Sequence, residues 1–333
     1  MDIFFTFDYE LFFGNKSGSA EKCLLEPTNE LIRIAEKSKV SFTFFIDTGY
    51  LVKLNEFRKK FPALEKNYSE VSRQLETLVR SGHDLQLHIH PHWENNIYNG
   101  SAWVMNTNRY KLADFSDSEA AQIFESCYEE LKKHCPPPVA FRAGGWCIQP
   151  FEKFKSSFIK SGIVYDSSVY KGGSRVSVQY DFDFSSAPSK TSWRFEDDPL
   201  KENPSGPFQE IAMTAQMLSP IFFWKLFLLG RMNPGRHKPV GDGFPLAVPG
   251  YRKQILTQFT LHCTSADGYF ASEIETASRN TAQQNSGNEF VVIGHPKAMT
   301  KYSIEKLEVL IPKLQKNNSI TSFTLYHAAK RKK

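Results

Sequence analysis

Short apolar runs alternate with longer amphipathic stretches along this chain of 333 residues. Runs rich in Phe, Ile and Val, such as residues 2–7 and 289–294, have the length and composition of buried strands. Stretches such as 69–81 repeat apolar positions every three or four residues, as amphipathic helices do. Because strands and helices alternate, the pattern predicts an α/β fold with parallel strands. Strands are expected at 2–7, 40–46, 84–88, 138–142, 163–165, 289–294 and 320–325, and helices at 30–39, 69–81, 118–134, 150–161 and 303–316.

Three of the nine histidines occupy alternate positions at the end of one expected strand: His88, His90 and His92. Pro91 interrupts any helix through this segment, so the chain should leave the strand and turn. Neutral imidazole is the commonest metal ligand in proteins. The segment therefore indicates a metal site at a strand end, with an exposed histidine-rich loop as the alternative.

Two carboxylates follow the first expected strand, in Asp8-Tyr9-Glu10. In hydrolytic sites one carboxylate can bind a metal while its neighbour takes a proton. By itself, such a pair is more often a solvated strand end. The carboxylate pair becomes informative together with the histidine cluster, because the carboxyl ends of parallel strands meet at one edge of a sheet. Active sites of α/β enzymes lie at this edge.

Two more polar groups come directly after β-prone runs. Arg142 begins the segment Arg142-Ala143-Gly144-Gly145-Trp146, and His295 ends the run 290–294. A single arginine is usually a surface cation, and a single histidine after a strand is usually structural. Four polar clusters at four strand ends together predict one shared site.

In order and spacing, these clusters resemble the motifs of the polysaccharide deacetylases of carbohydrate esterase family 4, whose common part is the NodB homology domain. Thr6 to Glu10 is similar to the first motif with one inserted residue, and Gly82 to His92 is similar to the second. The third and last motifs are matched by Arg142 to Trp146 and by Ile293 to His295, while Tyr165 to Ser168 stands in the place of the fourth without its tryptophan. The resemblance spans residues 1–170 and about 286–327.

The resemblance implies a single domain, residues 1–333, folded as an irregular (β/α)7–8 barrel of the NodB type. Residues 171–285, which match the family poorly, are expected to be an insertion or a cover over the active site. Residues 330–333 form a basic segment that we interpret as a solvated tail, with contact to an acidic membrane as the minor alternative.

The resemblance also implies roles for individual residues. Asp8 would be the general base, His295 the general acid, and Arg142 would orient Asp8 and keep it ionised. Glu10, His88 and His92 would hold one divalent metal, with Glu10 departing from the usual aspartate and His90 able to replace one of the ligands. Zinc suits two imidazoles and one carboxylate best, and cobalt, nickel or iron could bind the same set. Contacts to substrate are expected from Tyr9, His90, Trp93, Trp146 and Asp166.

The expected function is the metal-dependent hydrolysis of an N-acetyl or related acyl group on an amino sugar, in the biosynthesis of a polysaccharide or O-antigen precursor. Three alternatives remain: an amidohydrolase on a small cyclic amide or ureide, a non-catalytic sugar-binding protein with the same fold, and a nucleotide-sugar transferase that reads Asp8 and Glu10 as its acidic motif. The transferase leaves the histidine cluster without a role. The sugar-binding protein does not need Asp8 and His295, and both are present.

Charge and cysteines bear on partners and location. A formal net charge of +5 is too small to argue for a nucleic-acid partner. Five scattered cysteines without Cys-x-x-Cys spacing indicate free thiols in a reducing compartment. The first β-prone run starts directly after Met1, so we expect no signal peptide, a cytoplasmic location, and an amino sugar or carrier-linked glycan as substrate.

Residues 171–285 hold two further features. The apolar run 221–229 is too short and too charged to span a bilayer. We expect a buried core helix there, with a lid or dimer face and a membrane-surface helix as alternatives. The glycine-rich segment 233–243 is either a surface loop or a site for the phosphate or carboxylate of a charged substrate, with Arg236 and Lys238 as the cations.

Overall fold

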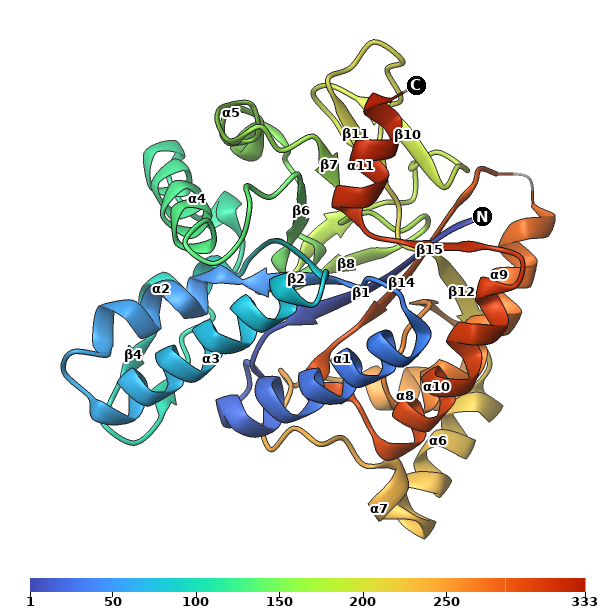
Figure 1. The fold of residues 1–333 in the computed structure, drawn as a ribbon, viewed down its shortest axis with the longest axis horizontal. Helices are drawn as coiled ribbons and strands as arrows, with labels where there is room; N and C mark the ends of the chain where they lie inside the picture. The colour runs from blue at the N-terminus through green and yellow to red at the C-terminus, as the bar shows by residue number, and fades with distance from the viewer. Residues whose placement is uncertain (285, 333) are drawn as a thin grey trace.

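The computed structural model describes residues 1–284 and 286–332, and within them nine strands form one sheet that curves into a nearly closed barrel (Figure 1). The strand order is β10-β11-β7-β6-β3-β2-β1-β14, and β15 also pairs with β1. Every pair in this sheet is parallel except β10 with β11. The strands are β1 (Asp2–Tyr9), β2 (Thr43–Asp47), β3 (Asp84–Ile89), β6 (Ala140–Ala143), β7 (Tyr165–Asp166), β10 (Ser192–Phe195), β11 (Phe208–Ile211), β14 (Glu289–Gly294) and β15 (Ser319–Thr321).

Helices lie around the outside of the barrel (Figure 1). They are α1 (Glu26–Ser38), α2 (Thr48–Phe57), α3 (Pro62–Arg80), α4 (Asp117–Leu131), α5 (Glu152–Ser161), α6 (Pro220–Met232), α7 (Pro234–His237), α8 (Tyr251–Thr257), α9 (Ile274–Gln283), α10 (Lys301–Gln315) and α11 (Phe323–Arg331). Three two-stranded antiparallel sheets complete the fold: β4 (Ile97–Tyr98) with β5 (Trp103–Val104), β8 (Ser174–Val176) with β9 (Asp181–Asp183), and β12 (Ala215–Leu218) with β13 (Thr260–Cys263). The predicted α/β barrel is therefore confirmed.

Alternation along β1 sets which side chains face the barrel interior. Phe5 and Phe7 belong to the large apolar cluster shared with the surrounding helices, whereas Phe4 belongs to a second cluster that includes Phe45 and Phe323. Since side chains of a strand alternate between its two faces, Asp8 lies on the face of Phe4. Both faces are buried, which explains why β1 carries large apolar side chains on both of them.

Several boundaries differ from the expected ones, most clearly near the C-terminus. The strand expected at 320–325 ends at Thr321, because the Ser322 side chain accepts a hydrogen bond from the backbone N–H of Leu325 and starts α11. Residues 330 and 331 continue α11 instead of forming a tail, and Lys333 lies outside the described residues. Part of the segment 171–285 belongs to the barrel itself, because it supplies β10 and β11 of the sheet.

The expectation of a buried core helix at 221–229 was wrong. These residues form most of α6, in which only Phe222 and Phe223 are buried. With Leu218 and Ile255 they make a small apolar cluster separate from the barrel core. The helix is a surface helix because it covers only this cluster. Among the residues that the structure describes, no helix combines the length and apolar character needed to cross a membrane.

Candidate active site

The four polar clusters meet at one edge of the barrel. In the parallel ladders, Asp47 of β2 is paired with His88 of β3, and His88 with Arg142 of β6. On the other side, Asp8 of β1 is paired with β2, and Phe7 is paired with Gly294, directly before His295. The carboxyl ends of these strands thus bring together side chains that lie far apart in the sequence.

A carboxylate and two imidazoles form a buried group that could hold a metal ion. Glu10 Oε2 lies 3.1 Å from His88 Nε2 and 2.6 Å from His90 Nε2. The three ligand atoms all lie within 4.8 Å of one another. His88 Nδ1 donates to the Arg142 carbonyl oxygen at 2.7 Å, which leaves Nε2 directed at the group. A backbone partner on the second ring nitrogen is the usual way in which proteins orient a metal-binding histidine.

His90, and not His92, is the second imidazole of this group. The backbone stays extended through His90, with φ −104° and ψ 97°, so His88 and His90 share one face of the strand. A 3₁₀ turn then begins at Pro91 and carries His92 away. The His92 ring stacks on Tyr110, and neither of its nitrogens has a hydrogen-bond partner among the described residues. The group that could hold a metal therefore contains His90 where the resemblance implies His92.

Gly144 makes room for His90. A Cβ at Gly144 would lie 2.7 Å from His90 Nδ1 and 2.5 Å from the Ile89 carbonyl oxygen. Both distances are far below a normal van der Waals contact, so only glycine fits. Two residues later, Trp146 has φ +62°, a conformation that costs a non-glycine residue about 1–3 kcal/mol. This strained backbone directs the indole into the cavity described below.

Lys297 holds the second oxygen of Glu10, a contact for which the sequence contains no clear signal. Its Nζ donates to Glu10 Oε1 at 2.8 Å and to the Leu11 carbonyl oxygen at 2.6 Å. Burial raises the pKa of Glu10, but Lys297 and the two imidazoles outweigh burial and hold this pKa well below its ordinary value. An ionised carboxylate with one oxygen directed at two imidazoles is a donor set that fits a divalent cation such as zinc.

Asp8 is held by a fully buried arginine. Arg142 donates to Asp8 Oδ1 at 2.6 Å, to Thr6 Oγ1 at 3.0 Å and to the Ser167 carbonyl oxygen at 2.9 Å. Its guanidinium also lies 4.1 Å from the ring centre of Phe45. With so many contacts the arginine cannot move, and Asp8 Oδ2 stays free to face the site.

His295 is held in the same way from its other side. Its Nδ1 lies 2.7 Å from Asp267 Oδ2, and its backbone N–H donates to Asp267 Oδ1 at 2.7 Å. Nε2 faces the acids, 3.7 Å from Glu10 Oε1 and 3.9 Å from Asp8 Oδ2. Burial lowers the pKa of His295, but Asp267 and the two other carboxylates raise it to about 9 overall. Sequence reasoning missed Asp267, which lies in the poorly matched segment and follows no strand pattern.

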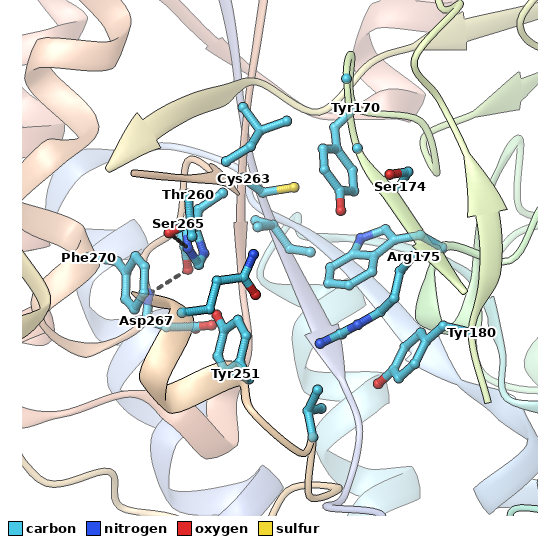
Figure 2. Close-up of a pocket in the computed structure, with 18 of the residues that line it drawn as sticks. Tyr170, Ser174, Arg175, Tyr180, Tyr251, Thr260, Cys263, Ser265, Asp267 and Phe270 are labelled. Atoms are coloured by element: carbon cyan, nitrogen blue, oxygen red, sulfur yellow. Dashed lines mark hydrogen bonds between the residues drawn. The ribbon is translucent and has the colours of Figure 1, made fainter. Parts of the chain in front are cut away.

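Two adjoining cavities open beside these groups. The smaller, about 170 Å³, is lined by Asp8, Glu10, His88 and His90. The larger, about 630 Å³, is lined mainly by residues 170–175 and 245–270 and reaches His295. Figure 2 shows Tyr170, Tyr180 and Tyr251 around the larger cavity, with the Arg175 side chain projecting between them. Both cavities share Trp146, Tyr180, Pro245, Leu246 and His295.

Of the expected substrate contacts, His90 and Trp146 line these cavities, whereas Tyr9 and Trp93 do not. Tyr9 lies between the inward-facing Asp8 and Glu10 and therefore points to the helices, where its hydroxyl donates to Gln74 Oε1 at 2.8 Å. Trp93 is buried and its Nε1 donates to Asp47 Oδ2 at 2.6 Å. Both are structural.

The expected anion-binding cations also lie elsewhere. Arg236 is on the exposed helix α7 and pairs with Glu305 at 2.8 Å, and Lys238 follows it on the surface. Neither lines a cavity described here. Arg175 is instead the cation of the large cavity, and among the described residues it forms no ion pair. Its guanidinium stands 4.6 Å from the ring centre of Tyr180.

Asp166, also expected at the substrate, is fully buried beside a second acid. It is paired in register with Glu210 of β11, and Ser168 Oγ donates to its Oδ1 at 2.8 Å. Burial raises the pKa of Asp166, and burial together with Asp166 raises that of Glu210 well above its ordinary value. Among the described residues, Glu210 Oε2 has no hydrogen-bond partner. A proton on Glu210 would let this oxygen donate to Asp166, so we interpret the two acids as a buried pair that shares one proton.

Replacing Glu210 by Gln should stabilise the protein increasingly as pH rises. A carboxyl whose folded pKa is raised contributes stability that is present at low pH and lost as pH rises through the folded pKa. The amide mimics the protonated acid at every pH. The difference in unfolding free energy between variant and wild type should therefore grow from about pH 5 to about pH 8. Denaturant unfolding at several pH values measures this difference in unfolding free energy, and the exposed Glu152→Gln variant is the control. A difference that does not change with pH would contradict the shared proton.

No family model matches the sequence, and no curated protein matches it. Among solved structures, the chain is similar to a protein from Mycobacterium smegmatis assigned as a polysaccharide deacetylase, with TM-score 0.51 and 15% identity, over 99% of this chain and 91% of that chain. It is also similar to Puue allantoinase, with TM-score 0.50 and 8% identity, over 97% of this chain and 87% of that chain. At these identities the likeness shows the fold alone.

The resemblance to polysaccharide deacetylases that the motifs suggested is thus confirmed as a structural match. An allantoinase shares the fold to a similar degree, so the fold does not select between an amide on a sugar and a cyclic amide. That choice depends on the residues of the site and its cavities.

Proposed function

We propose that this protein is a metal-dependent hydrolase that removes an N-acetyl or related acyl group from an amino sugar. The observation that carries the proposal is the convergence of three built parts around one small cavity. These parts are the group Glu10–His88–His90, Asp8 held by Arg142, and His295 held by Asp267. Amide hydrolysis needs a polarised carbonyl, a base for water and an acid for the leaving nitrogen, and each part suits one of these tasks.

Glu10, His88 and His90 would hold a divalent metal, and zinc matches this donor set best. When bound, such a metal supplies Lewis-acid polarisation of a carbonyl group and lowers the pKa of a water molecule. Asp8 Oδ2, free of Arg142, accepts the proton of the attacking water. Arg142 holds Asp8 in place throughout. His295 Nε2, which faces the same small cavity, delivers a proton to the amine nitrogen as it leaves. Asp267 keeps the imidazole in the orientation that this transfer needs.

The large cavity supports a sugar as substrate. Three tyrosines and Trp146 line it, and flat aromatic faces suit the apolar faces of pyranose rings. The unpaired Arg175 in the same wall suits a phosphate or carboxylate on the sugar or its carrier. We therefore include in the proposal a carrier-linked amino sugar, and a cytoplasmic location, which the five free cysteines support.

Acetate release tests the function. We expect purified protein supplemented with zinc, cobalt, nickel or iron to release acetate from N-acetylated amino sugars, and faster from sugars with an anionic carrier than from neutral ones. Arg175→Gln should remove this preference for anionic carriers while neutral substrates are hydrolysed as before. The alternative function is a cyclic amidohydrolase, because Puue allantoinase has a similar fold. Hydrolysis of allantoin or hydantoin without any acetate release would replace the proposal by this alternative.

A further inference from the structure

Helix α6 presents an apolar face to solvent. Its exposed large apolar residues are Ile221, Trp224, Leu228 and Met232, between 56% and 77% exposed. Their spacing of three and four residues places them on one side of the helix, opposite the buried Phe222 and Phe223. Figure 1 shows α6 and α7 at the periphery of the fold, away from the barrel sheet.

The chain around α6 concentrates exposed apolar side chains. Of the sixteen large apolar residues that are exposed in the described structure, nine lie within residues 215–262. Besides the four of α6, they are Met217, Val240, Phe244, Val248 and Phe259. Such clustering is unusual for a surface that faces only water.

The same segment is basic. Residues 215–262 hold six lysines and arginines against one acid, Asp242, so they account for the whole formal charge of +5 of the chain. Lys225 and Arg231 lie on the exposed side of α6 itself, and among the described residues only Arg236 of the six is in an ion pair. Asp242 is occupied by Ser19 and Lys16. The charge of this surface is therefore not balanced from within.

This combination fits a lipid surface better than a second copy of the chain. A symmetric dimer through α6 would press like charges against each other without acids to pair them. An anionic bilayer offers both partners at once, phosphates for the lysines and arginines and an acyl boundary for the apolar side chains. Exposed Trp, Leu and Ile flanked by Lys and Arg are the composition of helices that lie in the membrane interface.

From this surface we infer that the protein docks on anionic phospholipid bilayers through the outer face of α6. The large cavity lies next to this surface, because Val248 and Phe259, which flank α8, line it, and α8 packs on α6 through Ile255. Docking would bring the cavity to the lipid surface, where a lipid-carried glycan is presented; this last point rests on the proposed function, whereas the docking itself does not.

Vesicle sedimentation tests the docking without an activity assay. We expect the full chain to sediment with vesicles of equal parts phosphatidylcholine and phosphatidylglycerol, and to stay in solution with phosphatidylcholine alone or with mixed vesicles at high salt. Trp224→Ser with Leu228→Ser should weaken binding on the order of tenfold or more, and Lys225→Glu with Arg231→Glu should weaken it similarly. The matched control is Ile159→Ser with Val309→Ser, two residues of comparable exposure on other helices.

The outcomes show whether the outer face of α6 binds a bilayer or a second copy of the chain. Binding that both α6 variants lose and the control keeps supports docking, provided that all three variants unfold at the temperature of the wild type. Failure of the wild type to bind the mixed vesicles, or full binding by the Trp224 and Leu228 variant, overturns it. Light scattering tests self-association. If the wild type is a dimer that does not bind vesicles, and the Trp224 and Leu228 variant is a monomer, the face binds a second copy of the chain instead.

Discussion

Replacing Asp8 by Asn should reduce acyl-group hydrolysis on the order of a hundredfold or more, while the metal content stays close to that of the wild type. Asparagine keeps an oxygen that can accept the hydrogen bond from Arg142, so the side chain should stay in place. It cannot take a proton from water, and Asp8 is not part of the group Glu10–His88–His90. The loss should therefore fall on the rate of the chemical step and not on metal binding.

Tyr9→Phe is the matched control for this experiment. It changes the next residue of β1, which faces the helices, and removes one hydrogen bond to Gln74. Its activity should stay near that of the wild type. Steady-state kinetics and elemental analysis on both variants decide the matter: an Asp8→Asn enzyme that keeps most of its rate, or one that loses its metal, rules out Asp8 as the base.

Metal analysis of histidine variants should show a contrast between His90 and His92. We expect close to one divalent metal per wild-type chain, and its loss to background in His88→Ala and in His90→Ala, because each change removes one of three protein ligands. His92→Phe should keep the metal. Within residues 1–284 and 286–332 the His92 ring makes no hydrogen bond, and it stacks on Tyr110, a packing role that a phenyl ring can take over.

The alternative ligand set gives the opposite result. If His92→Phe empties the site while His90→Ala leaves it full, the metal is bound by the i and i+4 pair that the motif resemblance implied. Activity should follow the metal in either case, falling with whichever histidine holds it. Thermal unfolding of each variant separates loss of a ligand from loss of the fold.

Local patterns in the sequence were enough to predict the parallel α/β sheet, and the motif resemblance added its closure into a barrel. Strands of parallel α/β folds are buried on both faces, so many of them stand out as mainly apolar runs, and β1 and β14 were recognisable in this way. The strand β3 was recognisable instead by its alternation of apolar and polar residues. Their carboxyl ends meet at one edge whatever the details of packing. Polar residues that directly follow such runs, as Asp8, Arg142 and His295 do, can therefore be assigned to one site before the structure is known.

The tertiary structure decided what depends on contacts between distant segments. Whether His90 or His92 faces Glu10 depends on how far β3 stays extended before the turn at Pro91, and His90 also needs the space beside Gly144. Asp267 and Lys297 act only through partners far away in the sequence or on another strand end, so no local pattern marks them.

Burial was the other property that the sequence could not supply. Asp166 lies at the carboxyl end of a strand, as the residues proposed to be catalytic do, yet a neighbouring strand from residues 171–285 covers it with Glu210. The apolar run of α6 has the composition of a core helix, but it remains at the surface because it packs only on a small cluster with Leu218 and Ile255, separate from the barrel core. Composition determines which side chains are apolar, and only the three-dimensional arrangement determines which of them are buried.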